Sequence, residues 1–277
     1  MGAVWAAWDE MLNRDVAVKE LILPTDIDDI GQAEIYERMV REARAAATLR
    51  HPSIVKVHDV VSEEGRPWIV MELLRGRTLQ QLVRSGELLA PERAALLGAE
   101  LLGALAVAHE EGIQHRDVKP ANVFLCDDGR VVLTDFGIAR MEGQVTITGS
   151  GMLIGSPGYI APERLRGERG GPLSDLWSLG ATLYAAVEGE APFHADTPVV
   201  ILHRALTQEV PMPRRAGPML GPVLLRMLAR EPAHRPDVAT ATRWLQEVAG
   251  GTPSNLPPMP APADPPAPQP GTPREMP

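Results

Sequence analysis

The sequence predicts an α+β fold of two lobes, a small β-rich lobe followed by a larger, mainly helical one. Three observations predict this arrangement. Strand-like and helical segments alternate over the first seventy residues, the chain turns mainly helical from about Leu79, and 277 residues with 44% hydrophobic content can bury a large core. We therefore expect the small lobe over residues 1–73 and the larger lobe over residues 74–249.

Three strands and one helix are expected in the small lobe. Runs rich in β-branched residues predict strands at Val16–Ile22, Ile54–Val61 and Arg66–Leu73. Between the first two strands, Asp29–Leu49 carries charges on one face of a helical pattern. The first lobe should therefore be β-rich with one long helix.

The larger lobe begins with a helix over Ala90–Gly112, where leucines recur at helical spacing, Pro91 stands near the start and Gly112 follows the end. A second helix, Ser174–Gly189, is apolar nearly all round, which is typical of a helix buried inside a lobe. Residues 250–277 hold 11 of the 27 prolines and few large apolar residues. This last segment should form an extended, disordered tail outside the core.

Composition excludes several classes of partner. A net charge of -9 and a pI near 5.3 argue against a general nucleic-acid or anionic-membrane binder. The longest apolar stretch, Ala95–His109, is interrupted by Glu100 and is shorter than the roughly 20 residues that span a bilayer. One cysteine, Cys126, and an N-terminus without a signal-peptide pattern favour a cytoplasmic location with no membrane segment.

Polar side chains cluster at the ends of two short apolar runs. Asp117 and Asn122 lie on a loop before the strand-like Val123–Leu125, and the run that starts at Val131 brings Asp135 to another loop end. Two carboxylates and an amide suit a hard cation with oxygen ligands, and Mg²⁺ is the common case. The pattern alone does not identify a reaction.

The ordered set of motifs is more specific. It contains AVK at 17–19, a helix with glutamates, HRDVKPAN at 115–122, DFG at 135–137, APE at 161–163 and DLWSLG at 175–180. From Gly2 to about Ala249 the chain resembles a bacterial, eukaryotic-like serine/threonine protein kinase. The resemblance implies a two-lobed protein-kinase fold over residues 1–249 and transfer of the ATP γ-phosphate to protein hydroxyls.

The resemblance also assigns roles on the acceptor side of the reaction. Asp117 is expected to orient the acceptor hydroxyl and take its proton, while Lys119 steadies the γ-phosphate and favours serine or threonine as acceptor. Asn122 and Asp135 are expected to carry Mg²⁺, with Mn²⁺ as an alternative metal. Protein substrates and ATP are the implied partners.

On the nucleotide side, the resemblance implies that Lys19 holds the α and β phosphates and is itself held by Glu42 on the helix. Glu42 is chosen by its position in the helix, with Glu37 and Glu34 as the alternatives. The glycine lid is represented by Gly2. The adenine slot is expected between Val4 and Ala17 above and Phe124 below, with Met71 as gatekeeper and Glu72 to Leu74 as the hinge.

Kinase activity is expected to be regulated by phosphorylation of the segment between the DFG and APE motifs. Arg116 could pair with a phosphate there, and we expect Thr146 and Thr148 to be autophosphorylated, with a homodimer serving transfer in trans. Two further acidic residues are expected to be structural. Glu163 should form a buried ion pair with Arg235, and Asp175 should tether the catalytic loop from below.

The chain departs from the family pattern at its start. MGAV matches only the third glycine and the valine of the phosphate-covering loop, through Gly2 and Val4, so the small lobe should lack a first strand. Met1 is then interpreted as an internal methionine of a longer protein. The sequence is compatible with three functions: a weakened kinase, a pseudokinase scaffold and a magnesium phosphohydrolase. The phosphohydrolase is the least favoured, because Lys19 and Glu42 would have no role in it.

Overall fold

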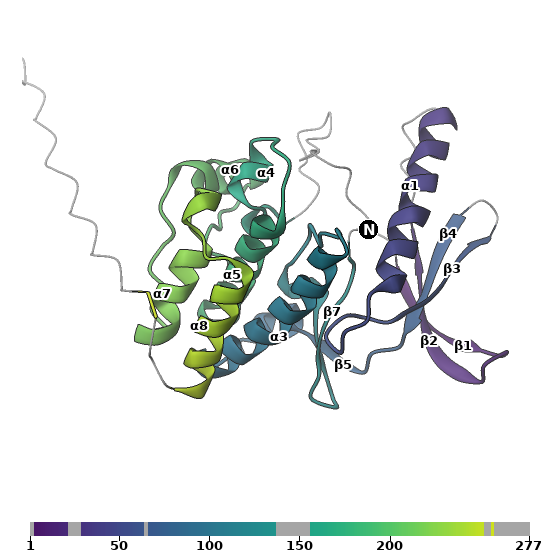
Figure 1. The fold of residues 1–277 in the computed structure, drawn as a ribbon, viewed down its shortest axis with the longest axis horizontal. Helices are drawn as coiled ribbons and strands as arrows, with labels where there is room; N and C mark the ends of the chain where they lie inside the picture. Colours follow the sequence, from purple (N-terminus) through teal and green to yellow (C-terminus); the bar gives the residue numbers. More distant parts are fainter. Residues whose placement is uncertain (1–2, 22–28, 64–65, 137–155, 252–255, 258–277) are drawn as a thin grey trace, which may run out of the picture.

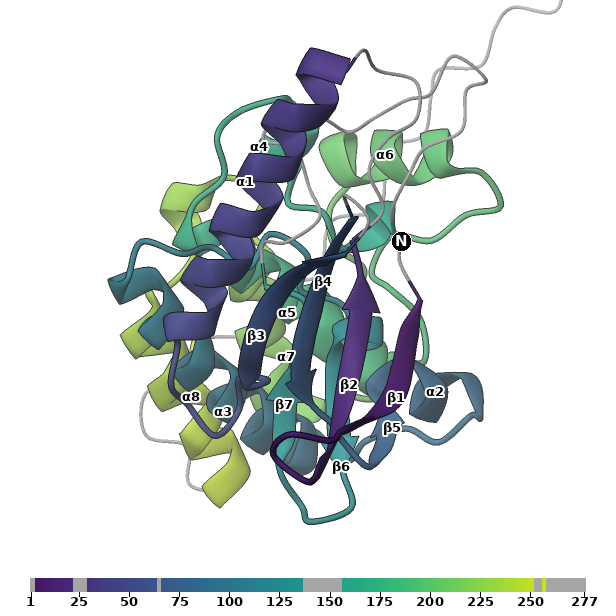
Figure 2. The same ribbon diagram turned by 90° about the vertical axis from the view of Figure 1, so that its right-hand side faces the viewer.

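A computed structural model describes residues 3–21, 29–63, 66–136, 156–251 and 256–257. It has a sheet with one long helix at one end and a bundle of helices at the other, with a second, smaller sheet between them (Figures 1 and 2). This arrangement confirms the predicted α+β fold with a β-rich lobe before a helical one.

The small lobe is an antiparallel sheet of four described strands in the order β1-β2-β4-β3, with α1 beside it. Its elements are β1 (Val4–Asp9), β2 (Arg14–Glu20), α1 (Asp29–Thr48), β3 (Val57–Glu63) and β4 (Arg66–Glu72). The helix packs on the sheet through a cluster that includes Met39 and Ala43 from α1 and Ile69 from β4. Helix and sheet therefore share one apolar core.

Strand β1 was not predicted from the sequence. Its side chains are mostly exposed, with 55% exposure for both Val4 and Trp8, so the strand buries little apolar surface of its own. It forms because its backbone pairs with β2 in a regular register that sets Val4 opposite Lys19. The predicted strand at Ile54–Val61 is also displaced, since β3 starts only at Val57.

The larger lobe contains a three-stranded sheet, in the order β5-β6-β7, and seven described α-helices. They are β5 (Gly76–Thr78), α2 (Leu79–Arg84), α3 (Pro91–Glu110), β6 (Val123–Cys126), β7 (Val131–Leu133), α4 (Pro162–Leu165), α5 (Pro172–Glu188), α6 (Pro198–Thr207), α7 (Gly217–Met227) and α8 (Val238–Gly250). Every side chain from Ser174 to Val187 on α5 is buried, as the sequence predicted. Helices α3, α7 and α8 contact α5 and one another around this core (Figure 1).

The expected tail differs from the prediction at one point. Leu256 packs against the core of the helical lobe, and Pro257 is buried, although both fall in the proline-rich segment. Residues beyond α8 therefore make apolar contact with the core, after the helix ends at Gly250 and Gly251 caps it in the left-handed conformation.

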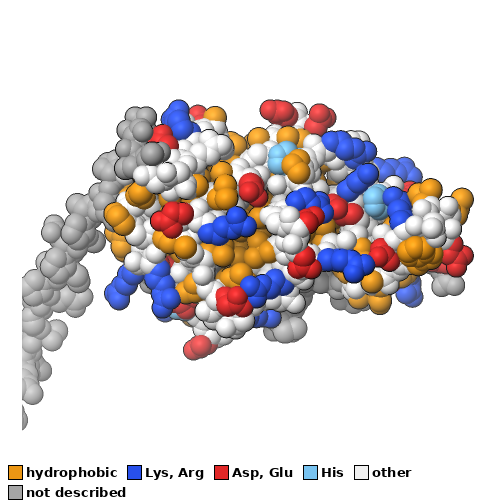
Figure 3. All heavy atoms as spheres, turned by 90° about the horizontal axis from the view of Figure 1, so that it is seen from below, with side chains coloured by type: hydrophobic (Ala, Val, Ile, Leu, Met, Phe, Trp, Pro, Cys, Tyr) orange, Lys and Arg blue, Asp and Glu red, His pale blue; other side chains and the backbone are white. Residues whose placement is uncertain are grey.

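Two surface properties bear on partners. Among the described residues, no helix combines the length and the apolar character needed to cross a bilayer. Acidic and basic side chains are interspersed over the face shown in Figure 3. The charge of this face is therefore mixed, which fits the sequence-based argument against a general binder of polyanions.

Candidate active site

The loop from His115 to Asn122 is anchored from below by Asp175 on α5. The Asp175 carboxylate accepts hydrogen bonds from the backbone N–H groups of His115 and Arg116, at 2.9 and 2.8 Å, and contacts His109 Nε2 at 2.8 Å. Burial raises the pKa of Asp175, but the hydrogen bond from His109 and the neighbouring positive groups outweigh it, so the pKa lies below its usual value. The carboxylate is therefore held ionised, and the predicted tether is confirmed.

The backbone reverses at Arg116, where φ is +66°. A non-glycine residue in this left-handed region is strained and persists only where its surroundings fix it. Here Asp175 accepts from the Arg116 amide, and the Arg164 side chain donates to the Arg116 carbonyl. The reversal sets the direction in which the chain continues into Asp117.

Three polar side chains meet at the end of this loop. Lys119 Nζ lies 2.7 Å from Asp117 Oδ2, and Asn122 Nδ2 donates to the Asp117 carbonyl at 2.9 Å and to Oδ2 at 3.2 Å. Lys119 and Asn122 are buried, with only 3% and 6% of their surface exposed. A carboxylate fixed beside a buried cation can take a proton from a bound hydroxyl while the cation faces an anionic group.

The chain brings a second carboxylate to the same place through β7. Asp135 follows β7 with φ of +65°, and its Oδ1 lies 2.5 Å from Lys19 Nζ on β2. Thr134 donates its backbone N–H to the Asn122 carbonyl at 2.9 Å, and its own carbonyl contacts His115 Nε2 at 2.8 Å. These bonds fix Asp135 next to the loop that carries Asp117.

The structure corrects one expected contact. Within the described residues Lys19 makes its ion pair with Asp135, and Glu42 Oε1 lies 3.5 Å from Arg116 Nη1 instead of pairing with Lys19. Glu42 therefore lies close to the site, but its ion pair is with Arg116 rather than with Lys19. The physical reason is that Lys19 finds a carboxylate at closer range in Asp135.

Two oxygen ligands for a metal are available here. No group of three or more His, Cys, Asp and Glu that could hold a metal occurs among the described residues. The Asp135 carboxylate and the Asn122 amide oxygen nevertheless fit a hard cation that takes few protein ligands and completes its shell with phosphate and water.

An apolar cluster lies between β2, the end of β4 and the β6–β7 hairpin. Its buried members are Ala17, Val55, Met71 and Val132, and the partly buried side chains against it are Leu73, Leu74, Phe124 and Cys126. Ala17, Met71, Leu74 and Phe124 were predicted to lie here, and Leu73 falls within the predicted hinge. Val55, Val132 and Cys126 were missed, because nothing in a β-branched run indicates which of its residues join such a cluster. Val4 is half exposed, and Gly2 lies outside the described residues.

At the predicted hinge, Glu72 already has internal partners. Its backbone N–H donates to the Lys56 carbonyl at 2.9 Å, and its carboxylate accepts from the Lys56 backbone N–H at 2.9 Å. The carboxylate also lies 3.4 Å from the Arg130 guanidinium. Hinge donors for a ligand must therefore come from residues after Glu72.

A buried ion pair supports the site from the helical lobe. Glu163 accepts two hydrogen bonds from Arg235, at 2.7 and 2.8 Å, and one from Ser174 at 2.5 Å. Burial raises the pKa of Glu163, but these bonds outweigh it and hold the pKa below its usual value. The predicted Glu163–Arg235 pair is confirmed.

Besides part of the apolar cluster, sequence reasoning missed His109, and it named three site residues that the structure does not describe, Gly2, Thr146 and Thr148. His109 in the last turn of α3 was not singled out, and a histidine there gives no distinctive signal without knowledge of what packs against the helix end. The expected phosphorylation sites Thr146 and Thr148 fall outside the described residues.

Residues 1–246 match the family described as protein kinase domain. A probable serine/threonine-protein kinase of Streptomyces coelicolor is 39% identical over 245 residues, which cover 85% of this chain and 36% of that protein. Serine/threonine-protein kinase PknB of Mycolicibacterium smegmatis is 39% identical, with 88% of this chain and 40% of that protein covered. Serine/threonine-protein kinase PrkC of Bacillus subtilis is 34% identical, with 86% and 37% covered. The chain spans about two fifths of the length of these relatives.

Proposed function

The chain belongs to the protein kinase domain family, and from this premise we propose that it transfers the γ-phosphate of ATP to serine or threonine hydroxyls of proteins. The observation that carries the proposal is the group of Asp117, Lys119 and Asn122 on a loop clamped by Asp175. The names of the relatives support the same acceptor class.

On the acceptor side, Asp117 orients the hydroxyl and takes its proton. The hydroxyl oxygen forms a bond to the γ-phosphorus while the bond from that phosphorus to the β-phosphate oxygen breaks, so ADP leaves with the electron pair. Lys119 faces the transferred group with a compact positive charge that is already desolvated, which makes its attraction stronger than in water. Asn122 keeps the Asp117 carboxylate in place.

On the nucleotide side, the apolar cluster around Ala17, Met71 and Phe124 supports binding of the adenine ring, because such rings bury well between aliphatic and aromatic side chains. Lys19 leads from this cluster toward the phosphates. Residues Leu73 and Leu74 supply the hinge backbone groups that remain after Glu72 is satisfied internally.

The metal site we propose consists of Asn122 and Asp135, whose oxygen ligands suit Mg²⁺ and, as an alternative, Mn²⁺. When bound, a divalent cation neutralises charge on the phosphates. The chain contributes by holding Asn122 to Asp117 and Asp135 to the same loop, so that both oxygen ligands face one region.

The activity is tested by intact-mass analysis of the purified chain after incubation with ATP and Mg²⁺. We expect mass steps of one phosphoryl group, and Asp117→Asn should lower the rate by roughly 100- to 10,000-fold because a general base is lost. A matched control, Asp196→Asn, changes an exposed carboxylate on the segment before α6 and should keep the rate. Equal rates in the wild type and Asp117→Asn would refute the assignment.

Regulation is proposed at Thr146 and Thr148, with trans-autophosphorylation in a homodimer and a cytoplasmic location. The support is Arg116, whose guanidinium lies at the site and could pair with phosphate. Phosphopeptide mapping of the active protein should find at least one of the two threonines modified. Active protein with neither site phosphorylated would contradict this part of the proposal.

A further inference from the structure

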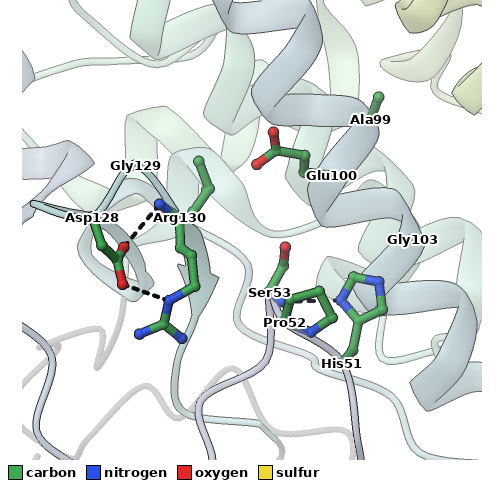
Figure 4. Close-up of a pocket in the computed structure, with 10 residues that line it drawn as sticks. His51, Pro52, Ser53, Ala99, Glu100, Gly103, Asp128, Gly129 and Arg130 are labelled. Carbon is green, nitrogen blue, oxygen red and sulfur yellow. Dashed lines mark hydrogen bonds and ion pairs between the residues drawn. The ribbon is translucent and has the colours of Figure 1, made fainter.

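A second hollow lies between the two lobes, away from the residues of the proposed reaction. It is lined by His51, Pro52 and Ser53 of the segment after α1, by α3 around Glu100 and Gly103, and by the β6–β7 turn at residues 128–130 (Figure 4). We call it the interlobe pocket. Its volume is about 550 Å³, which lies within the range of small-molecule sites.

The pocket has an excess of negative charge. The Glu100 carboxylate makes no hydrogen bond or ion pair with the described residues, and burial raises the pKa of this group against a smaller opposing effect from Arg93. Arg130, the arginine that lines the pocket, is already engaged, at 2.8 Å from Asp128 and 3.4 Å from Glu72. Glu100 therefore lacks a close positive partner.

The wall opposite Glu100 offers an acceptor and a flat ring. Figure 4 shows the Ser53 hydroxyl and the Glu100 carboxylate on either side of the space, and that hydroxyl makes no hydrogen bond with the described residues. His51 Nδ1 accepts the Ser53 backbone N–H at 3.1 Å, and burial lowers the pKa of the ring. A neutral imidazole therefore lines the pocket.

Glycine at position 103 allows this ring to lie against α3. A Cβ atom there would come within 3.3 Å of His51 Nε2, which is tighter than an ordinary van der Waals contact. The Nε2 edge of the ring therefore lies against the backbone of α3, where both His51 and Gly103 line the pocket.

We propose that the interlobe pocket binds a guanidinium group. A guanidinium is planar, carries several N–H donors in a fixed fork, can donate to both Glu100 oxygens and the Ser53 hydroxyl, and stacks on flat rings. An ammonium group would satisfy the charge but would neither stack on His51 nor bind the carboxylate in a two-point manner. The guanidinium can come from an arginine side chain of a polypeptide or from free arginine.

Ligand binding here is connected to the proposed nucleotide site through the backbone. The Ser53 carbonyl accepts from Leu133 N–H at 2.9 Å, and the Leu133 carbonyl accepts from Val55 N–H at 3.1 Å. Leu133 is the last residue of β7, two positions before Asp135. A ligand that fixes Ser53 against Glu100 therefore restricts the strand that positions Asp135, and this part of the inference rests on the proposed function.

The first test is calorimetric titration with N-acetyl-arginine amide, which needs no catalysis and can also be run on Asp117→Asn. We expect a Kd on the order of 1 mM or tighter. Glu100→Gln and the neutral isostere N-acetyl-citrulline amide should each weaken binding by about tenfold or more, since one charge-assisted pair is lost. Glu110→Gln, an exposed change on the same helix, should bind like the wild type.

Three outcomes would overturn the proposal: no binding of the capped arginine, equal binding to Glu100→Gln, or equal binding of N-acetyl-lysine amide. Free arginine is titrated in parallel. Tighter binding of the capped form supports a polypeptide source, and tighter binding of the free form supports the metabolite.

The coupling is tested by repeating the titration with saturating ATP and Mg²⁺ on Asp117→Asn. Because linkage is reciprocal, the Kd of the capped arginine should change by at least about threefold. An unchanged Kd would overturn the coupling while leaving the binding site and the proposed kinase activity to their own tests.

Discussion

The buried pair of Glu163 and Arg235 allows a quantitative prediction for Arg235→Met. The Arg235 side chain is fully buried, and its guanidinium donates to Glu163 and to the carbonyl oxygens of Ala229, Leu173 and Arg230. Methionine fills a similar volume but donates nothing. The substitution would leave the Glu163 carboxylate, only 5% exposed, with Ser174 as its remaining donor.

The expected loss follows from the burial of that charge. Removing one partner of a buried ion pair costs about 3–5 kcal/mol, because the other charge stays desolvated without compensation. If this is the cause, the double variant Arg235→Met with Glu163→Gln should be more stable than Arg235→Met alone, by about 2 kcal/mol, since no charge is then buried. The second substitution is therefore expected to stabilise.

The measurement is urea unfolding followed by tryptophan fluorescence, with Trp177 buried in the same lobe as a reporter. Arg169→Met, at an exposed arginine on the loop after α4, is the matched control and should lie within about 0.5 kcal/mol of the wild type. A loss below about 1 kcal/mol for Arg235→Met, or a double variant less stable than the single one, would refute the argument.

Three further outcomes are expected. Asp175→Asn should lower the rate of autophosphorylation more than it lowers the affinity for ATP, because the Asp175 carboxylate fixes the loop rather than the nucleotide site. Separate measurements of the autophosphorylation rate and of the Kd for ATP check this. Cys126 should be alkylated slowly at neutral pH, because burial raises the pKa of its thiol. ATP should slow the reaction further, because Cys126 packs against the apolar cluster proposed to bind adenine. Mass spectrometry after treatment with iodoacetamide measures both effects. Hydrogen bonds from Arg77 and Ser85 lower the pKa of Glu87 to about 2. The ionised carboxylate therefore stabilises the folded protein at pH values above 4.5, the ordinary pKa, and this contribution is lost as the pH falls toward 2. In Arg77→Met, a carbon-detected NMR titration should find the pKa of Glu87 closer to 4.5.

Local patterns in the sequence were sufficient for elements whose form is determined locally. The proline and glycine at the two ends of α3 predicted its bounds within two residues, and the all-round apolar pattern of α5 predicted its burial. Strand β1 was missed because it carries exposed side chains and exists through backbone pairing with β2. Pairing of this kind depends on a partner rather than on the composition of the strand.

In the candidate site, too, contacts between residues close in the sequence could be predicted, and contacts between distant residues could not. Asp117, Lys119 and Asn122 lie within six positions, so their proximity was predictable from the loop that carries them. Lys19 and its partner Asp135 are 116 positions apart, and the choice between Asp135 and Glu42 depends on how the lobes and α1 are placed. The role of His109 depends likewise on α5 packing against the end of α3.

The proposed role of Asp135 as a metal ligand would change its ion pair with Lys19. Asp135 Oδ1 lies 2.5 Å from Lys19 Nζ, and a divalent cation held by the same carboxylate would place a second positive charge close to the ammonium group. Under the proposed assignment, repulsion between these two charges would weaken the Lys19–Asp135 pair and leave Lys19 to interact with phosphate oxygens. A lysine released in this way also attracts Glu42, whose 3.5 Å contact with Arg116 is long and correspondingly weak. The two halves of the proposed site, Lys19 on β2 and Asp135 after β7, would then be linked through a change of charged partners.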